Sequence, residues 1–301
     1  MRARRPYLVV EYHGRLGNQL FEFASCFGLA RAAGAELRSL NGSVKEDDLL
    51  VRELLGSGYR EATKAQLLAV GIFPWSNSWK KLWQALTQRL VNRGRILFGR
   101  GPGLVVLWEP ASRYLPELRE LHLPVCIRGY LQSEQFFADC ADEIVEALHW
   151  PPANPVLPAG IGASVGMSFR RGDFNSLGWS LPLSYYDEAL ALVLGKVPNA
   201  TLVLFGDDQD FVQLAADRFR RSIPVIDALE IGSDPISQLA LLSRCDHCVI
   251  SNSSFAWWGA WLGDQLSRAT DRIVVAPQEY GEAGDRLPER WITLPTGATV
   301  F

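Results

Sequence analysis

The chain has 301 residues, a length at which a single hydrophobic core usually gives way to two. Hydrophobic residues make up 48% of the sequence and charged residues 21%, which excludes a largely disordered protein. The formal net charge of -3 lacks the basic excess of dedicated nucleic-acid binders, so we expect no nucleic-acid partner.

The cysteines are odd in number and widely spread, which argues against a disulfide-stapled secreted scaffold: Cys26, Cys126, Cys140, Cys245 and Cys248. Cys245 and Cys248 flank His247 like half of a zinc site, but no second pair lies at metal-ligand spacing. We therefore predict buried, reduced thiols and no bound metal. The N-terminus is basic but its apolar run is short, and no apolar stretch approaches the ~18 residues of a membrane span, so we expect a cytoplasmic protein.

The segment 151–158 reads PPANPVLP, with four prolines in eight positions. Such a segment cannot join a regular backbone ladder and prefers an extended form. We expect it to link an N-terminal domain, residues 1–150, to a C-terminal domain, residues 159–301.

The first half opens with an apolar run at 7–12, a turn-rich stretch at 14–18 and a helical pattern at 20–33. The second half alternates predicted strands at 165–169, 200–205 and 248–250 with predicted helices at 183–194, 209–219, 236–243 and 253–262. Alternating strands and helices predict an α/β fold with parallel sheets covered on both faces. Ligands of such sheets bind at the carboxyl ends of the strands.

Small polar residues fill the junction between the last of these strands and its helix, in the order Ser251, Asn252, Ser253 and Ser254. Unpaired backbone N–H groups at a helix start favour a phosphate site there. A plain helix N-cap explains the same residues about equally well. The tryptophans that follow at helical spacing are predicted core residues: Trp257, Trp258 and Trp261.

Arg170 and Arg171 follow the strand at 165–169, and adjacent side chains at a strand end point to opposite sides. One of them could clamp a diphosphate with two hydrogen bonds and stabilise it as it leaves. The alternative is a structural ion pair with Asp173.

Asp207, Asp208 and Asp210 follow the strand at 200–205. They could hold a divalent ion on a diphosphate. Alternatively, one carboxylate reads a nucleobase and the others cap the next helix. In the loop from Gly14 to Gln19, Arg15 and Asn18 offer polar contacts to a substrate, unless this loop is only a tight turn.

Taken in order, these motifs resemble glycosyltransferase family 11, the α-1,2-fucosyltransferases. The matching strings are GRLGNQLFEFA, GYLQSEQFF, SFRRGDF, LFGDD, CDHCVISNSSFAWWGAWL and IVVAPQEY. Each string alone is weak, whereas the ordered set is specific and runs over nearly the whole chain. The weakest stretch is about 40–125.

The resemblance implies a GT-B fold, with two Rossmann-like lobes and the active site in the cleft between them. The second lobe would hold GDP-β-L-fucose, and the first would hold a glycan acceptor that contains galactose. The implied reaction transfers L-fucose with inversion to the 2-hydroxyl of the galactose, with no cofactor or metal required.

The resemblance also implies roles for individual residues. Arg170 would hold the diphosphate, with Arg171 and Asp173 supporting it, and Asp207 would read guanine. Four residues would line the phosphates: Asn252, Ser253, Ser254 and Phe255. Arg15 and Asn18 match a loop that faces donor and acceptor, and we count Asn18 among the catalytic candidates.

The acceptor hydroxyl must lose a proton during an inverting transfer, ideally to a carboxylate or histidine within hydrogen-bond reach. Asp173 is the first candidate for this base and His13 the second, although a loose transition state would make a strong base unnecessary. One departure concerns the nucleotide: the family motif usually begins with His, and Ser168 stands in that place. Another GDP-sugar donor, or a binding protein without catalysis, therefore stays open.

The segment 62–108 contains seven Lys or Arg and no Asp or Glu. Within 79–95, tryptophans and leucines recur on one helical face, which is typical of a helix lying on an anionic membrane surface. Packing of an amphipathic helix on the first lobe is the favoured alternative. Peripheral contact with the inner face of the membrane is thus a further expectation.

Overall fold

The computed structural model describes residues 5–42, 44–72, 103–106, 113–150, 155–267, 271–279 and 285–297. The chain divides into two compact units. Unit 1 comprises residues 1–149 with 284–286, and unit 2 comprises residues 150–283 with 287–301. The predicted membrane-facing helix at 79–95 and the prolines at 151 and 152 lie outside the described residues.

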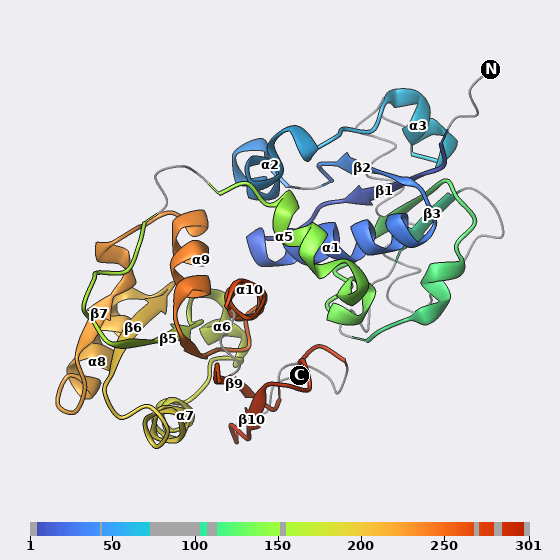
Figure 1. Ribbon diagram of the computed structural model, residues 1–301. Coiled ribbons are helices and arrows are strands. Elements are labelled where there is room, and N and C mark those ends of the chain that lie inside the picture. The colour runs from blue at the N-terminus through green and yellow to red at the C-terminus, as the bar shows by residue number, and fades with distance from the viewer. Residues whose placement is uncertain are drawn as a thin grey trace. The chain divides into compact units, whose positions relative to one another are not determined.

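Unit 1 contains a four-stranded parallel sheet in the order β2-β1-β4-β3 (Figure 1). Its strands are β1 (Tyr7–Glu11), β2 (Glu36–Leu40), β3 (Gly103–Val106) and β4 (Val125–Arg128). Its helices are α1 (Leu16–Ala32), α2 (Leu50–Leu55), α3 (Lys64–Ala69) and α5 (Ala141–Ala147). Since β1 and β4 are neighbours in register, their last residues, Glu11 and Arg128, lie opposite each other.

Helix α1 begins earlier than its sequence predicts. The stretch Leu16–Gln19, predicted as loop, forms the first turn of the helix. The Gln19 side chain is fully buried, donates to the Gly14 and Asp48 carbonyls at 3.0 and 2.9 Å, and accepts from the Val51 N–H at 3.1 Å. These three hydrogen bonds fix the backbone at the start of α1, where Gly14 and Gly17 would otherwise leave it flexible.

Unit 2 contains a six-stranded parallel sheet in the order β10-β9-β8-β5-β6-β7. Its strands are β5 (Ala163–Phe169), β6 (Ala200–Gly206), β7 (Val225–Asp227), β8 (His247–Val249), β9 (Val274–Pro277) and β10 (Ile292–Leu294). Counted from β5, this is the 3-2-1-4-5-6 order of a doubly wound sheet. The chain reverses direction between β5 and β8, and ligands of such sheets bind at the carboxyl ends of the strands at this switch point.

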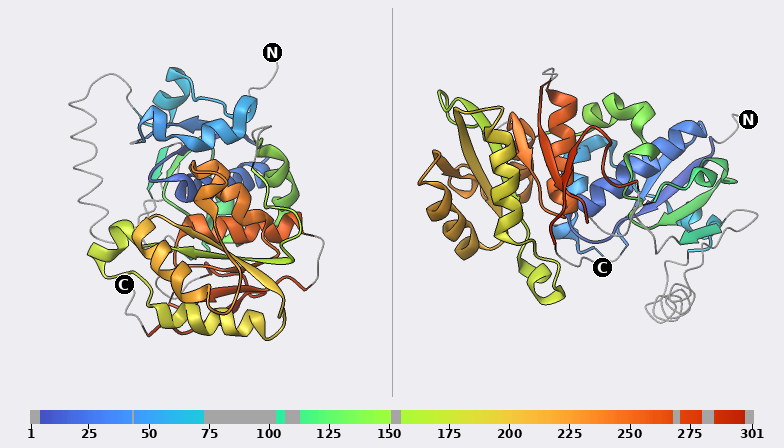
Figure 2. Two further views of the ribbon diagram at one scale, coloured as in Figure 1. Left: turned by 90° about the vertical axis from the view of Figure 1, so that its left-hand side faces the viewer. Right: turned by 90° about the horizontal axis from the view of Figure 1, so that it is seen from below.

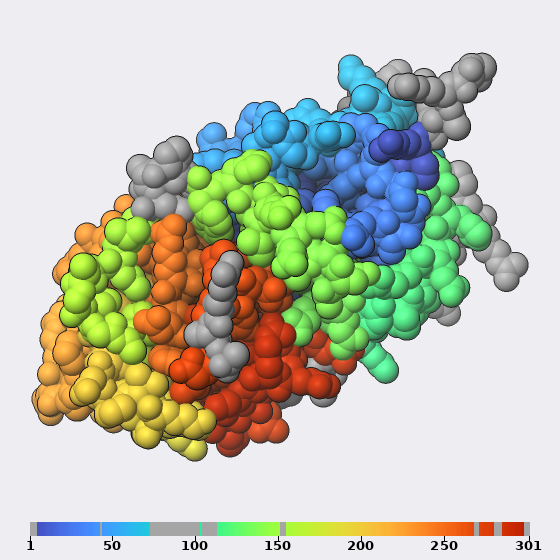
Figure 3. All heavy atoms as spheres, viewed as in Figure 1, coloured from blue at the N-terminus to red at the C-terminus, as the bar shows by residue number. Residues whose placement is uncertain are grey.

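Helices cover both faces of the sheet in unit 2 (Figure 2). They are α6 (Gly172–Leu177), α7 (Leu183–Leu194), α8 (Gln209–Phe219), α9 (Pro235–Arg244) and α10 (Ser254–Leu266). Every predicted helix and strand of this half is present, with ends that differ by a few residues at most. Figure 3 shows that atoms of α9, in orange, lie on the surface of unit 2, and that atoms of α5, in green, lie on the surface of unit 1.

Strand β5 explains how the two faces differ, because successive side chains point to opposite sides. Val165 and Met167 pack into the core that α7 and α8 cover. Gly166 faces the other way, where a Cβ would lie 2.7 Å from Leu242 of α9. Ser168 shares the face of Gly166, which places its hydroxyl on the side of the sheet that α9 and α10 cover.

The predicted core residues are buried as expected. The three tryptophans of α10 are at most 1% exposed and their rings contact one another, two pairs edge to face and one pair stacked: Trp257, Trp258 and Trp261. All five cysteines are free and buried. Within the described ranges, the structure contains no helix that is both long and apolar enough to cross a membrane.

Candidate functional site

The switch point of unit 2 is held together by Ser168 at the end of β5. The Ser251 N–H donates to the Ser168 hydroxyl oxygen at 3.2 Å, and the two hydroxyls lie 3.4 Å apart. Ser168 is only 4% exposed. The residue in the place of the family's histidine therefore fastens the loop after β8 to β5.

Arg170 lies one residue beyond β5 and meets two carboxylates. The register pairs Phe169 with Gly206, so the next residues along, Arg170 and Asp207, also come together. Arg170 donates from Nη1 to Asp207 Oδ2 and from Nη2 to Asp173 Oδ1, each at 2.5 Å. The arginine side chain is 15% exposed and that of Asp173 51% exposed. The guanidinium is thus oriented in advance yet open to solvent on one side.

Arg171 points away from this cluster, as neighbouring residues at a strand end should. Its guanidinium carbon lies 4.1 Å from the centre of the Phe211 ring, and its Nη1 donates to the Leu181 carbonyl at 3.3 Å. Arg170 carries the ion pair with Asp173 that the sequence leaves open as the alternative, because the first turn of α6 brings that carboxylate back over the strand end.

Asp207 is the residue that joins the two arginines. Its Oδ1 accepts from the Arg171 backbone N–H at 2.7 Å, and its Oδ2 accepts from Arg170. A Cβ on Gly172 would lie 2.7 Å from the same Oδ2. Both carboxylate oxygens are therefore engaged inside unit 2, and guanine reading by Asp207 stays a prediction. Asp208 caps α8 by accepting from the Phe211 N–H at 3.1 Å, in agreement with the capping alternative.

Helix α10 begins beside the switch point. Ser253 is its N-cap and accepts from the Phe255 N–H at 3.3 Å. Asn252 is 8% exposed and donates to the Trp179 carbonyl at 2.9 Å, while its buried Oδ1 accepts no hydrogen bond from the residues that the structure describes. The capping alternative is therefore realised, and the helix start still presents an anion-binding N-terminus with a spare acceptor next to it.

The predicted residues of unit 1 lie at the carboxyl end of β1. Arg15 is exposed and stands as the N-cap of α1, without a side-chain cap bond. Asn18 lies in the first turn, where its Oδ1 accepts from Gln132 at 3.0 Å. Gly14 has a φ of +69°, and a Cβ there would lie 2.6 Å from Asn18 Nδ2. The loop thus requires glycine both for its backbone and for the approach of Asn18.

A buried charged cluster that the sequence does not predict lies behind this loop. Glu11 accepts from Arg128 Nε and Nη2 at 2.7 to 2.9 Å, and His13 lies between Glu11 and Glu22. The signal was present as two acidic residues, Glu11 and Glu22, inside apolar runs. Burial lowers the pKa of His13, but the neighbouring carboxylates of Glu11 and Glu22 outweigh it and raise the pKa to about 9. A ring that holds its proton this firmly is a poor proton acceptor, so Asp173 stays the first candidate for the base.

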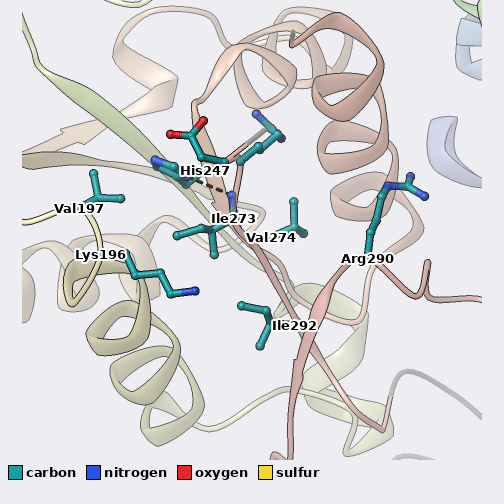
Figure 4. A pocket seen from close by; sticks show the side chains of 9 residues that line it. Lys196, Val197, His247, Ile273, Val274, Arg290 and Ile292 are labelled. Atoms are coloured by element: carbon teal, nitrogen blue, oxygen red, sulfur yellow. Dashed lines mark hydrogen bonds between the residues drawn. The ribbon is translucent and has the colours of Figure 1, made fainter. Parts of the chain in front are cut away.

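A hollow lies at the opposite edge of the second sheet, where β8, β9 and β10 begin (Figure 4). Its two arginines are already paired, since Arg272 and Arg290 lie 3.1 and 2.8 Å from Asp264. His247 accepts from the Ile273 N–H at 3.1 Å, and burial lowers its pKa. With both arginines held by Asp264, Lys196 is the other basic side chain in the lining of the hollow, and one lysine gives a phosphate no two-sided clamp. In the part of the chain that the structure describes, no three His, Cys, Asp or Glu side chains could share a metal ion.

Comparisons with known proteins agree with this arrangement. The chain is 28% identical over 142 residues to the O-antigen biosynthesis glycosyltransferase WbnK of Escherichia coli, covering 44% of each protein. It is 25% identical over 184 residues to an alpha-1,2-colitosyltransferase of Escherichia coli, covering 55% of this chain and 61% of that protein. The chain thus spans about half the length of these two relatives. It is also 22% identical over 302 residues to galactoside alpha-(1,2)-fucosyltransferase 2 of Rattus norvegicus, covering 97% and 77%.

The fold resembles that of POFUT1 in its crystal structure with GDP-fucose, with a TM-score of 0.51 and 12% sequence identity. The match covers 90% of this chain and 97% of that one, and the predicted GT-B fold of two α/β units is confirmed. The sequence profile of glycosyl transferase family 11 matches residues 120–283, which include β4, the whole arginine cluster and the start of α10. With more than half of its residues matched, this chain belongs to glycosyl transferase family 11.

Proposed function

We propose that the protein is an inverting α-1,2-fucosyltransferase that moves L-fucose from GDP-β-L-fucose to the 2-hydroxyl of a galactose in a glycan. The observation that carries this proposal is Arg170, which stands at the switch point with its guanidinium oriented by Asp207 and Asp173. Departure of GDP develops negative charge, and a preorganised guanidinium beside a helix N-terminus stabilises such charge. The names of the rat fucosyltransferase and the bacterial colitosyltransferase both specify an α-1,2 linkage.

Each side chain has a distinct place in this mechanism. Arg170 binds the diphosphate and stabilises it as it leaves, and the N-terminus of α10 at Ser254 contributes partial positive charge. Asp173 is the candidate base for the acceptor hydroxyl, because its carboxylate is exposed and lies beside Arg170. Arg15 and Asn18 would contact donor and acceptor from unit 1.

Transfer to a panel of galactose-terminated acceptors tests the function, with GDP release as readout and NMR of the product to assign linkage and anomer. An α-1,2-linked fucose made from the β-donor establishes both regiochemistry and inversion. Arg170→Ala should abolish transfer with an unchanged circular dichroism spectrum, and EDTA should leave the rate unchanged. A stable Arg170→Ala protein with full activity would refute the assignment.

A second candidate is an α-1,2-transferase that uses a different GDP-sugar. Ser168 favours it, because a buried serine that holds Ser251 stands where the family usually has a histidine. One relative is named a colitosyltransferase, so colitose is the first alternative sugar. Competition between GDP-fucose and other GDP-sugars in one reaction, followed by mass spectrometry of the product, decides between the two donors.

A further inference from the structure

Unit 1 contains a chain of four charged side chains at the carboxyl edge of its sheet, which the transfer chemistry above does not use. Arg128 of β4 binds Glu11 of β1, with Nε to Oε2 at 2.9 Å and Nη2 to both oxygens at 2.7 Å. His13 Nε2 lies 3.5 Å from Glu11 Oε1, and its Nδ1 lies 3.4 Å from Glu22 Oε1. The His13 backbone N–H also donates to Glu22 Oε2 at 2.9 Å. We call Glu11, His13, Glu22 and Arg128 the edge tetrad.

The edge tetrad is nearly buried. The exposed fractions of the side chains are 1% for Glu22, 7% for Glu11, 13% for Arg128 and 14% for His13. Buried ion pairs are seldom more stable than apolar side chains of the same size, because each charge loses its water. Glu11 already has an ion-pair partner in Arg128. The second pair, His13 with Glu22, therefore adds the free-energy cost of removing two more groups from water without supplying a partner that Glu11 lacks. Stability alone therefore does not explain the second pair.

Other titratable groups that act on the tetrad are neutral among the residues that the structure describes. Burial raises the pKa values of Tyr12, Cys26 and Tyr130, which interact electrostatically with Glu22, and of Cys126, which interacts in the same way with Glu11. Burial also raises the pKa of Glu22, against the pull of His13. Glu11 is therefore the main ionised partner of the His13 ring. Its pKa is lowered because His13 and Arg128 together outweigh the effect of its burial.

His13 connects the tetrad to the loop that carries Arg15 and Asn18. The ring Nδ1 lies 2.9 Å from the Glu11 carbonyl, so the side chain folds back on the strand and fixes the direction in which the chain leaves β1. Gly14 follows with its positive φ, and α1 then begins. Glu22 lies on α1 itself, so its contact with His13 closes a ring from the strand end through the loop to the helix.

The loop after β4 is fixed at the same edge. Gln132 donates to Asn18 at 3.0 Å, and Ser25 of α1 donates to the Leu131 carbonyl at 2.8 Å. Leu131 is buried with a φ of +44°, a conformation that a leucine keeps only when its surroundings enforce it. Arg128, the last residue of β4, ties this second loop to the tetrad through Glu11.

We propose that His13 is a positioning residue, whose ring, held between Glu11 and Glu22, fixes the loop from Gly14 to Asn18 in the geometry that fucosyl transfer requires. The proposal rests on the proposed function. His13 acts through Asn18 and Arg15 and does not touch the sugar or the diphosphate. The tetrad makes one rigid edge from two loops that are far apart in the sequence.

Glu22→Gln tests the proposal with little change of shape. The amide oxygen still accepts from the His13 N–H, but the side chain can no longer ionise beside the ring. We expect kcat/KM to fall by roughly 10- to 100-fold, the loss that a misplacement of about 1 Å produces. The alkaline limb of the pH profile of kcat/KM should also move to lower pH, whereas GDP affinity should stay within twofold, since Arg170 is unaltered.

Hydrogen–deuterium exchange supplies a readout that does not need activity. Glu22→Gln should speed exchange of the backbone amides in the segment 13–19, and Glu143→Gln, which only opens the exposed pair with Arg31, should alter neither exchange nor kcat/KM. Unchanged exchange and an unchanged pH profile in Glu22→Gln would overturn the proposal, even if the melting temperature fell. If the wild-type protein transfers no sugar, the proposed function fails, and exchange in this segment still decides whether the tetrad holds the loop.

Discussion

Asp207→Asn separates two roles for the carboxylate at the end of β6. The resemblance to the family implies that Asp207 reads guanine, whereas the structure engages both of its oxygens with the arginine pair. Asparagine has nearly the same shape. Its oxygen can still accept from the Arg171 N–H, but its NH2 group then faces Arg170 Nη1, donor against donor.

The magnitude follows from the bond that is lost. A hydrogen bond to a charged group contributes about 1.5–3 kcal/mol to stability, and the low end suits Asp207 because its side chain is 26% exposed. Removing a negative charge from the edge of the anion site opposes this loss, but an exposed charge contributes at most about 1 kcal/mol. The loss of the hydrogen bond that orients Arg170 is the larger of the two effects, so we expect the Kd for GDP to rise by a factor of up to about ten.

Calorimetric titration with GDP, ADP and inorganic diphosphate distinguishes the two roles. If Asp207 acts through Arg170, all three ligands weaken by the same factor. If Asp207 reads guanine, only GDP weakens, and the preference for GDP over ADP is lost. A selective loss for GDP would refute the reasoning from the ion pair.

The neighbouring carboxylate provides the matched control. Asp208→Asn makes the same chemical change one residue away, where the side chain only caps α8. It should leave all three affinities unchanged, because asparagine is also a good N-cap. Thermal unfolding of both variants verifies that each remains folded.

Three further predictions concern the two clusters. The raised pKa of His13 means that the folded state binds its proton more tightly than the unfolded chain does. This contribution to stability is complete below pH 6.5 and is lost as the pH rises through about 9. Melting temperatures between pH 6 and 9.5 should therefore fall in the wild type and fall less in His13→Gln. Gly172→Ala should weaken GDP binding several-fold in calorimetry with little change in melting temperature, because the new Cβ displaces Asp207 Oδ2; unchanged affinity would mean that Asp207 shifts freely. Asp173→Asn should tighten GDP binding a few-fold yet depress kcat in the transfer assay, and a loss of GDP affinity would contradict its role as the weaker of the two partners of Arg170.

Regular elements could be predicted from this sequence where apolar residues repeat without interruption. Helices α7 and α8 lie at their predicted positions, because Leu183–Leu194 and Gln209–Phe219 alternate apolar and polar faces at helical spacing. The start of α1 was missed, since two glycines next to polar residues resemble a turn, and the bonds that Gln19 makes to Gly14 and Val51 join residues far apart in the sequence.

The candidate site was predictable by residue type but not by pairing. Motif order brought Arg170 and Asp207 to the carboxyl ends of strands, yet their contact depends on the β5–β6 register, which a sequence does not contain. Glu11 and Glu22 escaped notice for a different reason. A single acidic residue in an apolar run is normally assigned to a solvent-facing position, and only the arrival of Arg128 and His13 from other parts of the chain makes its burial tolerable.

The two charged clusters differ in a way that suits different tasks. The edge tetrad brings two basic and two acidic side chains together and is nearly buried, so its geometry is strongly constrained. The Arg170 cluster has two carboxylates for one guanidinium and is open on the side of Asp173, so we expect a diphosphate that binds Arg170 to compete with Asp173 for its N–H groups. Asp173 is the weaker partner, being half exposed, whereas Asp207 is also held by the Arg171 N–H. Donor binding would then free the Asp173 carboxylate beside the reacting sugar at the moment when the acceptor hydroxyl needs a base, which links occupation of the donor site to the supply of the proton acceptor.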